Sequence, residues 1–303
     1  MRGIRTFGGL PHHLIVEGFD VAIVGVPWDG GASRRPGARF GPEAIRHAST
    51  TLERYHPTYQ LDLFQALRAV DWGDVEMVPG DALRAFDEIE GELTVFLGAG
   101  ATPIVLGGDH TILEGELSAL ASVVGPVALV MLDAHTDTLE EPDEDRTSRG
   151  GALRRAVVEG IVRPEQSLLA GLRGPLTGPL ELEWPKAVGF ELISCAELVT
   201  MAPEEFGRRV RERVGDAPVH LSVDLDVVDP AFAPATGTPE IGGLTSAQLV
   251  ALLRGLAGIP FRGYDVAELT PAYDTEGQTT ALLAANVVFE FLGLAATALA
   301  GGA

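Results

Sequence analysis

The chain of 303 residues is poor in cysteine and in positive charge. Its single cysteine, Cys195, excludes an internal disulfide framework and is typical of a reducing compartment. Lysine and arginine together number 22 against 43 acidic residues, which gives a formal net charge of −21. Because no basic surface could dominate this negative charge, a nucleic-acid partner is excluded. A cation, organic or metallic, is the more natural ligand.

Export and membrane signals are also lacking. The first 20 residues contain no apolar core long enough for a signal peptide. The stretch 281–303 is apolar, but Asn286 and Glu290 interrupt it and no basic flank follows. This pattern favours a helix packed against a sheet over a membrane span. We therefore expect a soluble, cytoplasmic protein without a membrane partner.

Apolar runs alternate with helical patterns along the chain. The runs that predict strands lie at 21–27, 102–107, 127–132, 167–172, 188–193, 218–223 and 260–267. Most of these runs are continuous, which is typical of parallel strands that are buried on both faces. Helical patterns lie between them, at 42–49, 81–97, 111–123, 150–160, 203–214, 244–257 and 278–298. The alternation predicts a single α/β domain over residues 1–303, a three-layer α/β/α architecture with a mainly parallel sheet.

Carboxylate and imidazole side chains follow three of the predicted strands. The motifs are Gly-Gly-Asp-His at 107–110, Asp-Ala-His-Thr-Asp at 133–137 and Asp-Leu-Asp-Val-Val-Asp-Pro at 224–230. Each alone is explained as well by a capped turn, a solvated turn or a calcium site. In an open α/β sheet, however, ligands bind beyond the carboxyl ends of the strands. We therefore expect the three motifs to meet at one edge of the sheet.

The three motifs together offer two imidazoles and at least four carboxylates. This is too much negative charge to bury without metal. Mixed histidine and aspartate ligands without cysteine suit a divalent ion such as Mn²⁺, with Mg, Fe, Co or Zn as weaker alternatives. Six ligands exceed the needs of one ion, so two ions that share bridging carboxylates, about 3.5–4 Å apart, fit better.

These motifs resemble the three signature motifs of the ureohydrolases, the family of arginase and agmatinase. The resemblance runs nearly from end to end, and the stretch GVPWDGGASRRPGARFGPEAIR at 25–46 is similar to the agmatinase branch. It implies an arginase-like α/β fold with a mainly parallel sheet and a two-manganese site in each chain. It also implies a homo-oligomer, either a trimer or a hexamer.

Carried over residue by residue, the resemblance implies which side chains hold each ion. One ion would be held by His110, Asp133, Asp137 and Asp224, and the other by Asp133, His135, Asp224 and Asp226. Two ions lower the pKa of a shared water, which supplies hydroxide at neutral pH for attack on a guanidinium carbon, with release of urea and an amine.

Asp137 and Glu268 are the predicted catalytic residues. The resemblance assigns Glu268, just after the predicted strand at 260–267, to pairing with the substrate guanidinium. From the residues alone, a solvated strand end would be the favoured interpretation of Glu268.

The sequence departs from the agmatinase pattern at Arg149. The family has a histidine there, which transfers protons and contacts the substrate. Arginine stays protonated at any working pH and cannot accept a proton, so Arg149 cannot replace that histidine. Two geometries are open. In the first, Arg149 binds a carboxylate of the substrate, which favours a guanidino acid. In the second, Arg149 pairs with the acidic run 140–145, and the enzyme is slow because no residue replaces the histidine.

Three functions stay open at this stage. The first is a manganese-dependent amidinohydrolase that releases urea, with agmatine as the default substrate by resemblance. The second is the same chemistry on a guanidino acid or on a biosynthetic guanidino intermediate. The third is a metal-binding regulatory paralogue with little catalysis. The complete ligand set argues against the third function, whereas the lost histidine argues for it.

Overall fold

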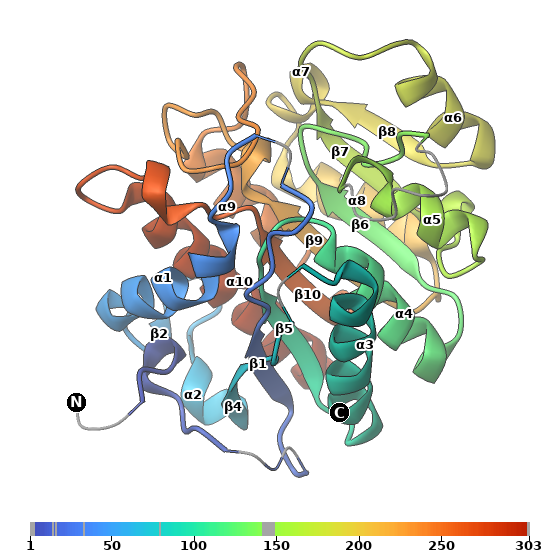
Figure 1. Ribbon diagram of the computed structural model, residues 1–303. Coiled ribbons are helices and arrows are strands. Elements are labelled where there is room, and N and C mark those ends of the chain that lie inside the picture. Colours follow the sequence, from blue (N-terminus) through green and yellow to red (C-terminus); the bar gives the residue numbers. More distant parts are fainter. Residues whose placement is uncertain are drawn as a thin grey trace.

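The computed structural model describes residues 4–13, 15, 17–32, 34–78, 80–140 and 149–301, and for Arg149 the backbone alone. Eight parallel strands form one sheet in the order β4-β1-β5-β10-β9-β6-β7-β8 (Figure 1). The strands are β1 (Val21–Gly25), β4 (Ala69–Asp74), β5 (Thr102–Leu106), β6 (Ala128–Leu132), β7 (Leu168–Leu172), β8 (Glu191–Ser194), β9 (Val219–Asp224) and β10 (Phe261–Ala267). A separate antiparallel pair joins β2 (Tyr55–His56) to β3 (Leu61–Asp62).

Ten α-helices connect and cover the strands in the described part of the chain. They are α1 (Gly41–Ala48), α2 (Leu63–Ala66), α3 (Ala82–Gly98), α4 (Ile112–Val124), α5 (Ala152–Val158), α6 (Leu180–Val188), α7 (Cys195–Leu198), α8 (Pro203–Val214), α9 (Ser246–Gly255) and α10 (Thr279–Gly301). Figure 1 shows α3, α4 and α5 on one side of the sheet and α1, α9 and α10 on the other.

Alternate residues of each central strand face two different apolar layers. In β6, Val130 and Leu132 pack with α1, α8, α9 and α10, whereas Leu129 and Met131 pack with α3, α4 and α5. This arrangement follows from the period of two along a strand, and it explains why the strand sequences are continuously apolar. The three-layer fold with a parallel sheet, expected from the sequence, is confirmed.

The seven strands expected from apolar runs are all present, but the edge strand β4 was not predicted. Its sequence, AVDWGD, contains a buried aspartate, Asp71, where an apolar residue would be expected. The guanidinium of Arg46 on α1 donates to both carboxylate oxygens of Asp71, at 2.9 and 3.0 Å. Because the partner of Asp71 lies far away in the sequence, the local pattern could not reveal this strand.

Helix α10 belongs to the core of the protein. By length and composition it could cross a membrane, but 67% of its most apolar window is buried inside the protein. Its one acidic residue, Glu290, is buried and accepts hydrogen bonds from Arg254 on α9 at 2.7 and 3.0 Å. The expectation of a packed helix rather than a membrane span is therefore confirmed.

Helices α8 and α9 approach each other at two glycines, Gly207 and Gly255. A Cβ atom at Gly207 would overlap the backbone carbonyl of Gly255, and one at Gly255 would overlap that of Pro203. Backbone atoms cannot move aside as a flexible side chain can. We expect Gly207→Ala to lower the free energy of unfolding by about 1–3 kcal/mol, measured by denaturant titration.

The matched control is Gly91→Ala in α3. Gly91 is exposed, and a Cβ atom there meets no other atom within 4 Å. Since alanine favours a helix more than glycine does, this substitution should raise stability by about 0.5–1 kcal/mol. Equal effects of the two substitutions would contradict the close approach at Gly207.

Candidate metal centre

Four neighbouring strands of the sheet end in the side chains that the sequence singled out. In the sheet, β5, β10, β9 and β6 lie side by side in this order. His110 follows β5, Glu268 comes directly after β10, Asp224 is the last residue of β9, and Asp133 comes directly after β6. Because all four strands are parallel, their carboxyl ends share one edge, and the three motifs converge there as expected.

The chain leaves the extended conformation as soon as β6 ends. Oδ1 of Asp133 accepts the backbone N–H of His135 at 2.6 Å, which closes a tight turn. Asp137 has a left-handed backbone with φ of 50°. Turns, and not an extended strand, therefore bring the side chains of Asp133, His135 and Asp137 to the site.

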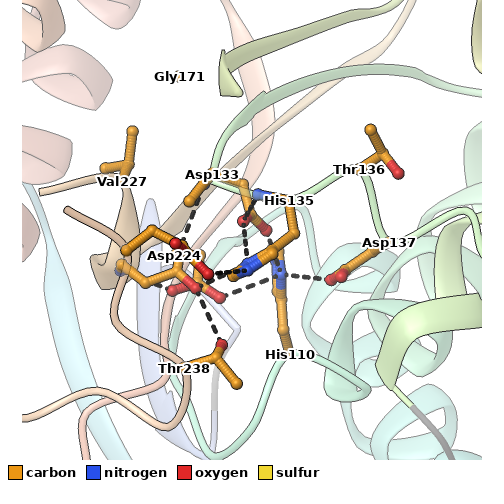
Figure 2. Close-up of polar contacts among 12 residues, drawn as sticks. His110, Asp133, His135, Thr136, Asp137, Gly171, Asp224, Val227 and Thr238 are labelled. Carbon is orange, nitrogen blue, oxygen red and sulfur yellow. Dashed lines mark hydrogen bonds and ion pairs between the residues drawn. The ribbon is translucent and has the colours of Figure 1, made fainter. Parts of the chain in front are cut away.

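The first group of candidate ligands surrounds the imidazole of His110 (Figure 2). Its Nδ1 lies 3.0 Å from Oδ2 of Asp133, 3.0 Å from Oδ2 of Asp137 and 3.6 Å from Oδ2 of Asp224. All four side chains are buried. Nδ1 of His110 and Oδ2 of Asp133 make no hydrogen bond of good geometry with any described residue. Buried polar atoms without a hydrogen-bond partner are what a binding site for a cation would offer.

The second group surrounds His135 and shares Asp133 with the first. Nδ1 of His135 lies 2.9 Å from Oδ2 of Asp226 and 3.5 Å from Oδ1 of Asp133. Thr238 contacts the same Oδ2 of Asp226 at 3.3 Å. The side chain of His135 is 30% exposed, so this group lies nearer to solvent than the first. A carboxylate shared by two groups is the arrangement that a bridged pair of ions needs.

The pKa values of the site residues reflect a surplus of buried negative charge. Burial and the neighbouring Asp226 raise the pKa of both Asp133 and Asp224. Burial alone would lower the histidine pKa values, but Asp226 and Asp133 raise the pKa of His135 to about 12. Asp133 and Asp137 likewise raise the pKa of His110 well above its usual value. Divalent ions would replace the protons on both rings and compensate the carboxylates.

Glu268 is not a solvated strand end. Its side chain is 2% exposed, its backbone is left-handed with φ of 67°, and Oε1 accepts the backbone N–H of His110 at 3.0 Å. The neighbouring Asp109 also stays out of the ligand groups. It accepts the backbone N–H groups of Gly31 at 2.7 Å and Thr111 at 3.1 Å, so it supports the turn.

The side chain of Arg149 and most of the acidic run 140–145 lie outside the described residues. The backbone of Arg149 begins a short 3₁₀ helix, Arg149–Gly151, directly before α5. Both geometries expected for Arg149 therefore stay predictions.

A cleft of about 550 Å³ opens at the more exposed side of the two groups. Its lining includes Arg34, Arg35, His135, Asp137, Thr238 and Glu240. Sequence reasoning singled out neither Thr238 nor Glu240 as site residues. The signal that could have found them is the glycine-rich stretch TGTPEIGGL at 236–244, which returns the chain to the site.

Comparison with known proteins agrees with the geometry of the site. A sequence model described as "Arginase family" matches residues 19–293. The chain belongs to the arginase family. Guanidinobutyrase from Pseudomonas aeruginosa is 40% identical over 293 residues, covering 96% of this chain and 92% of that protein. The mitochondrial agmatinase of Gallus gallus is 39% identical over 290 residues, covering 96% and 85%.

A solved structure gives the same result. Proclavaminate amidino hydrolase from Streptomyces clavuligerus matches with a TM-score of 0.91 at 38% identity, and the match covers 98% of both chains. This arginase-family protein is thus a hydrolase of amidine C–N bonds. Membership of this family argues for catalysis and against the regulatory paralogue.

We expect the purified protein to bind two divalent ions per chain. Asp133→Ala should lower that number and abolish activity, because it removes the carboxylate shared by both groups. Asp224→Ala should do the same. Elemental analysis after dialysis measures the number of bound ions.

The control is Asp229→Asn. This aspartate belongs to the same motif as Asp224, but it accepts the backbone N–H groups of Ala231, Gly242 and Gly243 instead. It should keep two ions per chain. Two ions per chain in the Asp133→Ala variant would contradict the assignment of the shared carboxylate.

Proposed function

We propose that this protein is a manganese-dependent amidinohydrolase that releases urea from a guanidino acid. The main support for a metal site is a pair of buried atoms, Nδ1 of His110 and Oδ2 of Asp133. They lie 3.0 Å apart among further carboxylates, and neither makes a hydrogen bond of good geometry with a described residue. Nitrogen and oxygen ligands without a thiolate suit Mn²⁺. When bound, a pair of such ions supplies a water of lowered pKa near neutral pH.

The proposed ligands are those expected from the sequence. One ion would be held by His110, Asp133, Asp137 and Asp224, and the other by Asp133, His135, Asp224 and Asp226. Support comes from the contacts of His110 and His135 with these carboxylates and from the raised pKa values that the crowding causes.

Two further carboxylates are proposed to act on the substrate. Glu268 is buried and fixed by the backbone N–H of His110, so it offers an oriented negative charge to a planar guanidinium. Asp137 lines the cleft and lies beside His110, and Arg149 cannot accept a proton. We therefore assign to Asp137 the transfer of a proton from the attacking water to the departing amine nitrogen.

The cleft favours a substrate with a carboxylate at its far end. Arg34 and Arg35 line the cleft, and neither pairs with a carboxylate in the described part of the chain. Arg35 lies over the ring of Tyr273, 5.2 Å from its centre. The acidic residues of the cleft have partners, because Glu181 accepts the N–H of Thr177 at 2.6 Å and Glu240 lies 3.8 Å from His135. Arg34 and Arg35 are therefore the cations of the lining that stay available to a substrate carboxylate.

The wider properties of the protein follow the family. We propose a single ureohydrolase domain, cytoplasmic, which assembles as a trimer or a hexamer. Light scattering of the purified protein measures the oligomeric state, and a monomer would contradict this part of the proposal.

Glu268→Gln should cut urea release sharply, since it removes the charge that faces the guanidinium. The loss of a buried charge-assisted pair costs on the order of 2–5 kcal/mol, or more than 10-fold in rate at fixed substrate. The number of bound ions should stay at two. Glu181→Gln, at the rim of the same cleft, is the control and should change the rate little. Unaltered kinetics of Glu268→Gln would remove it from the mechanism.

With Mn²⁺ added, the wild type should release urea faster from 4-guanidinobutyrate than from agmatine. Arg34→Ala and Arg35→Ala should lower kcat/KM for the acid by about 10- to 100-fold, the value of a charge-assisted hydrogen bond, and leave agmatine unaffected or improved. Arg84→Ala, on the exposed face of α3, is the control. A wild type that prefers agmatine would show that these arginines do not select an acid.

A further inference from the structure

A second buried group of titratable side chains lies behind the candidate metal centre. Glu116 on α4, His220 on β9 and Asp265 on β10 are each at most 1% exposed. Their neighbours in sequence on the two strands, such as Leu221 and Tyr264, face the opposite apolar layer. The period of two along a strand therefore places this group beneath α4, on the same face of β9 as Asp224.

The contacts within this group centre on one imidazole nitrogen. Nε2 of His220 lies 2.8 Å from Oδ2 of Asp265 and 3.2 Å from Oε2 of Glu116. Among the described residues, neither the two carboxylate oxygens of Glu116 nor Nδ1 of His220 make a hydrogen bond of good geometry. Space for the ring comes from Gly263 on β10, where a Cβ atom would lie 2.7 Å from Nδ1 of His220.

The two carboxylates favour the protonated form of His220. Burial would lower the pKa of His220, but Asp265 and Glu116 raise it to about 9. Burial and the nearby Asp265 raise the pKa of Glu116 to about 7. Buried charges of this kind contribute little net stability compared with apolar residues of the same size. Stability alone therefore does not explain why this core contains three titratable side chains.

A chain of hydrogen bonds links the group to the candidate ligand His110. Oδ1 of Asp265 accepts from the hydroxyl of Ser222 at 3.0 Å, and Oγ of Ser222 lies 2.8 Å from Nε2 of His110. Since a carboxylate only accepts, the one hydroxyl proton of Ser222 points to Asp265. Oγ must then accept from Nε2–H of His110. When His110 carries a single proton, that proton is on Nε2, and the lone pair of Nδ1 faces Asp133 and Asp224.

We propose that Glu116 and His220 are positioning residues for the metal centre. The side chain of His220, held between Glu116 and Asp265, fixes Asp265 as a hydrogen-bond acceptor, and Asp265 acts through Ser222 to present Nδ1 of His110 to the ion. This inference rests on the proposed two-ion function, and it adds residues that touch neither ion nor substrate.

The alternative of a third metal site in this group is less well supported. Nε2 of His220, the nitrogen that faces both carboxylates, lies at hydrogen-bond distance from Asp265, 2.8 Å, so a hydrogen bond already accounts for this contact. Both oxygens of Asp265 accept hydrogen bonds, from Ser222 and from His220. All three side chains are closed off from solvent, whereas a hard ion such as Mg²⁺ usually keeps several waters in its shell.

The experiment measures Mn²⁺ dissociation constants for both ions by titration with electron paramagnetic resonance of the free ion. Glu116→Gln and His220→Leu should weaken one of the two ions by about 10- to 100-fold and leave the other nearly unchanged. His220→Gln, which keeps a donor toward Asp265, should recover part of the affinity. Unchanged constants in His220→Leu would overturn the proposal.

A double variant, Glu116→Leu/His220→Leu, separates positioning from stability. Removing Glu116 together with His220 leaves one buried carboxylate, that of Asp265, without its cation, where His220→Leu alone leaves two. The double variant should therefore have a higher unfolding midpoint than His220→Leu while Mn²⁺ binding stays as weak. If Mn²⁺ affinity recovers together with stability, the pair is merely structural and the proposal is wrong. A third ion in the wild type that is lost in Glu116→Gln would overturn it in favour of a metal site.

The matched control is Glu290→Gln at a second buried pair. His56 and Glu290 lie 3.1 Å apart, are 0% and 3% exposed, and belong to β2 and α10, away from the candidate ligands. This variant should lower the unfolding midpoint without changing either dissociation constant. A wild type that binds fewer than two ions and releases no urea would instead refute the proposed function itself, and the two failures are thus distinguishable.

Discussion

The crowding of buried carboxylates at the ends of β6 and β9 is the constraint on which the rest of this structure depends. In each of the three central aspartates, Asp133, Asp224 and Asp226, one carboxylate oxygen accepts a hydrogen bond from a backbone N–H and the other faces an imidazole. Asp133 accepts from His135, Asp224 from Asp226, and Asp226 from Ala134. Their second oxygens face His110 or His135. Backbone amides thus fix the carboxylates in place but do not neutralise them, so the site has a surplus of negative charge that a cation can balance.

The order of the strands makes this crowding possible. The strands β5, β10, β9 and β6 are neighbours in the sheet, although β10 comes last in the sequence. The loop after β1 then closes over the same edge. Asp109, in the turn that precedes His110, accepts the N–H of Gly31, and Asp29 accepts that of Gly37. The rim of the cleft that carries Arg34 and Arg35 is therefore tied by hydrogen bonds to the turn before His110, at the candidate metal centre.

Local sequence patterns revealed the fold and the candidate ligands, because apolar runs and strand-end motifs are local. They missed β4, whose buried aspartate is explained only by Arg46, and α6, which contains Pro185. The left-handed backbone of Asp137 has no glycine to signal it. The resemblance to the family placed Glu268 in the site, whereas the residues alone favoured solvent. His220 lies in the apolar run of β9, and its partners Glu116 and Asp265 gave no local signal.

Two buried imidazole–carboxylate pairs in this chain have the same chemistry but different surroundings. One carboxylate oxygen of Glu290 contacts His56, and the other accepts hydrogen bonds from Arg254. The side chain of Arg254 is 37% exposed, so this pair is connected to the protein surface. One carboxylate oxygen of Asp265 contacts His220, and the other accepts a hydrogen bond from Ser222. Because Ser222 also contacts His110, this second pair is connected to His110. Burial and pairing alone therefore do not tell a structural pair from a functional one. The two pairs differ in what the second carboxylate oxygen contacts. The second oxygen of Asp265 connects through Ser222 to the candidate metal ligand His110, whereas that of Glu290 contacts Arg254.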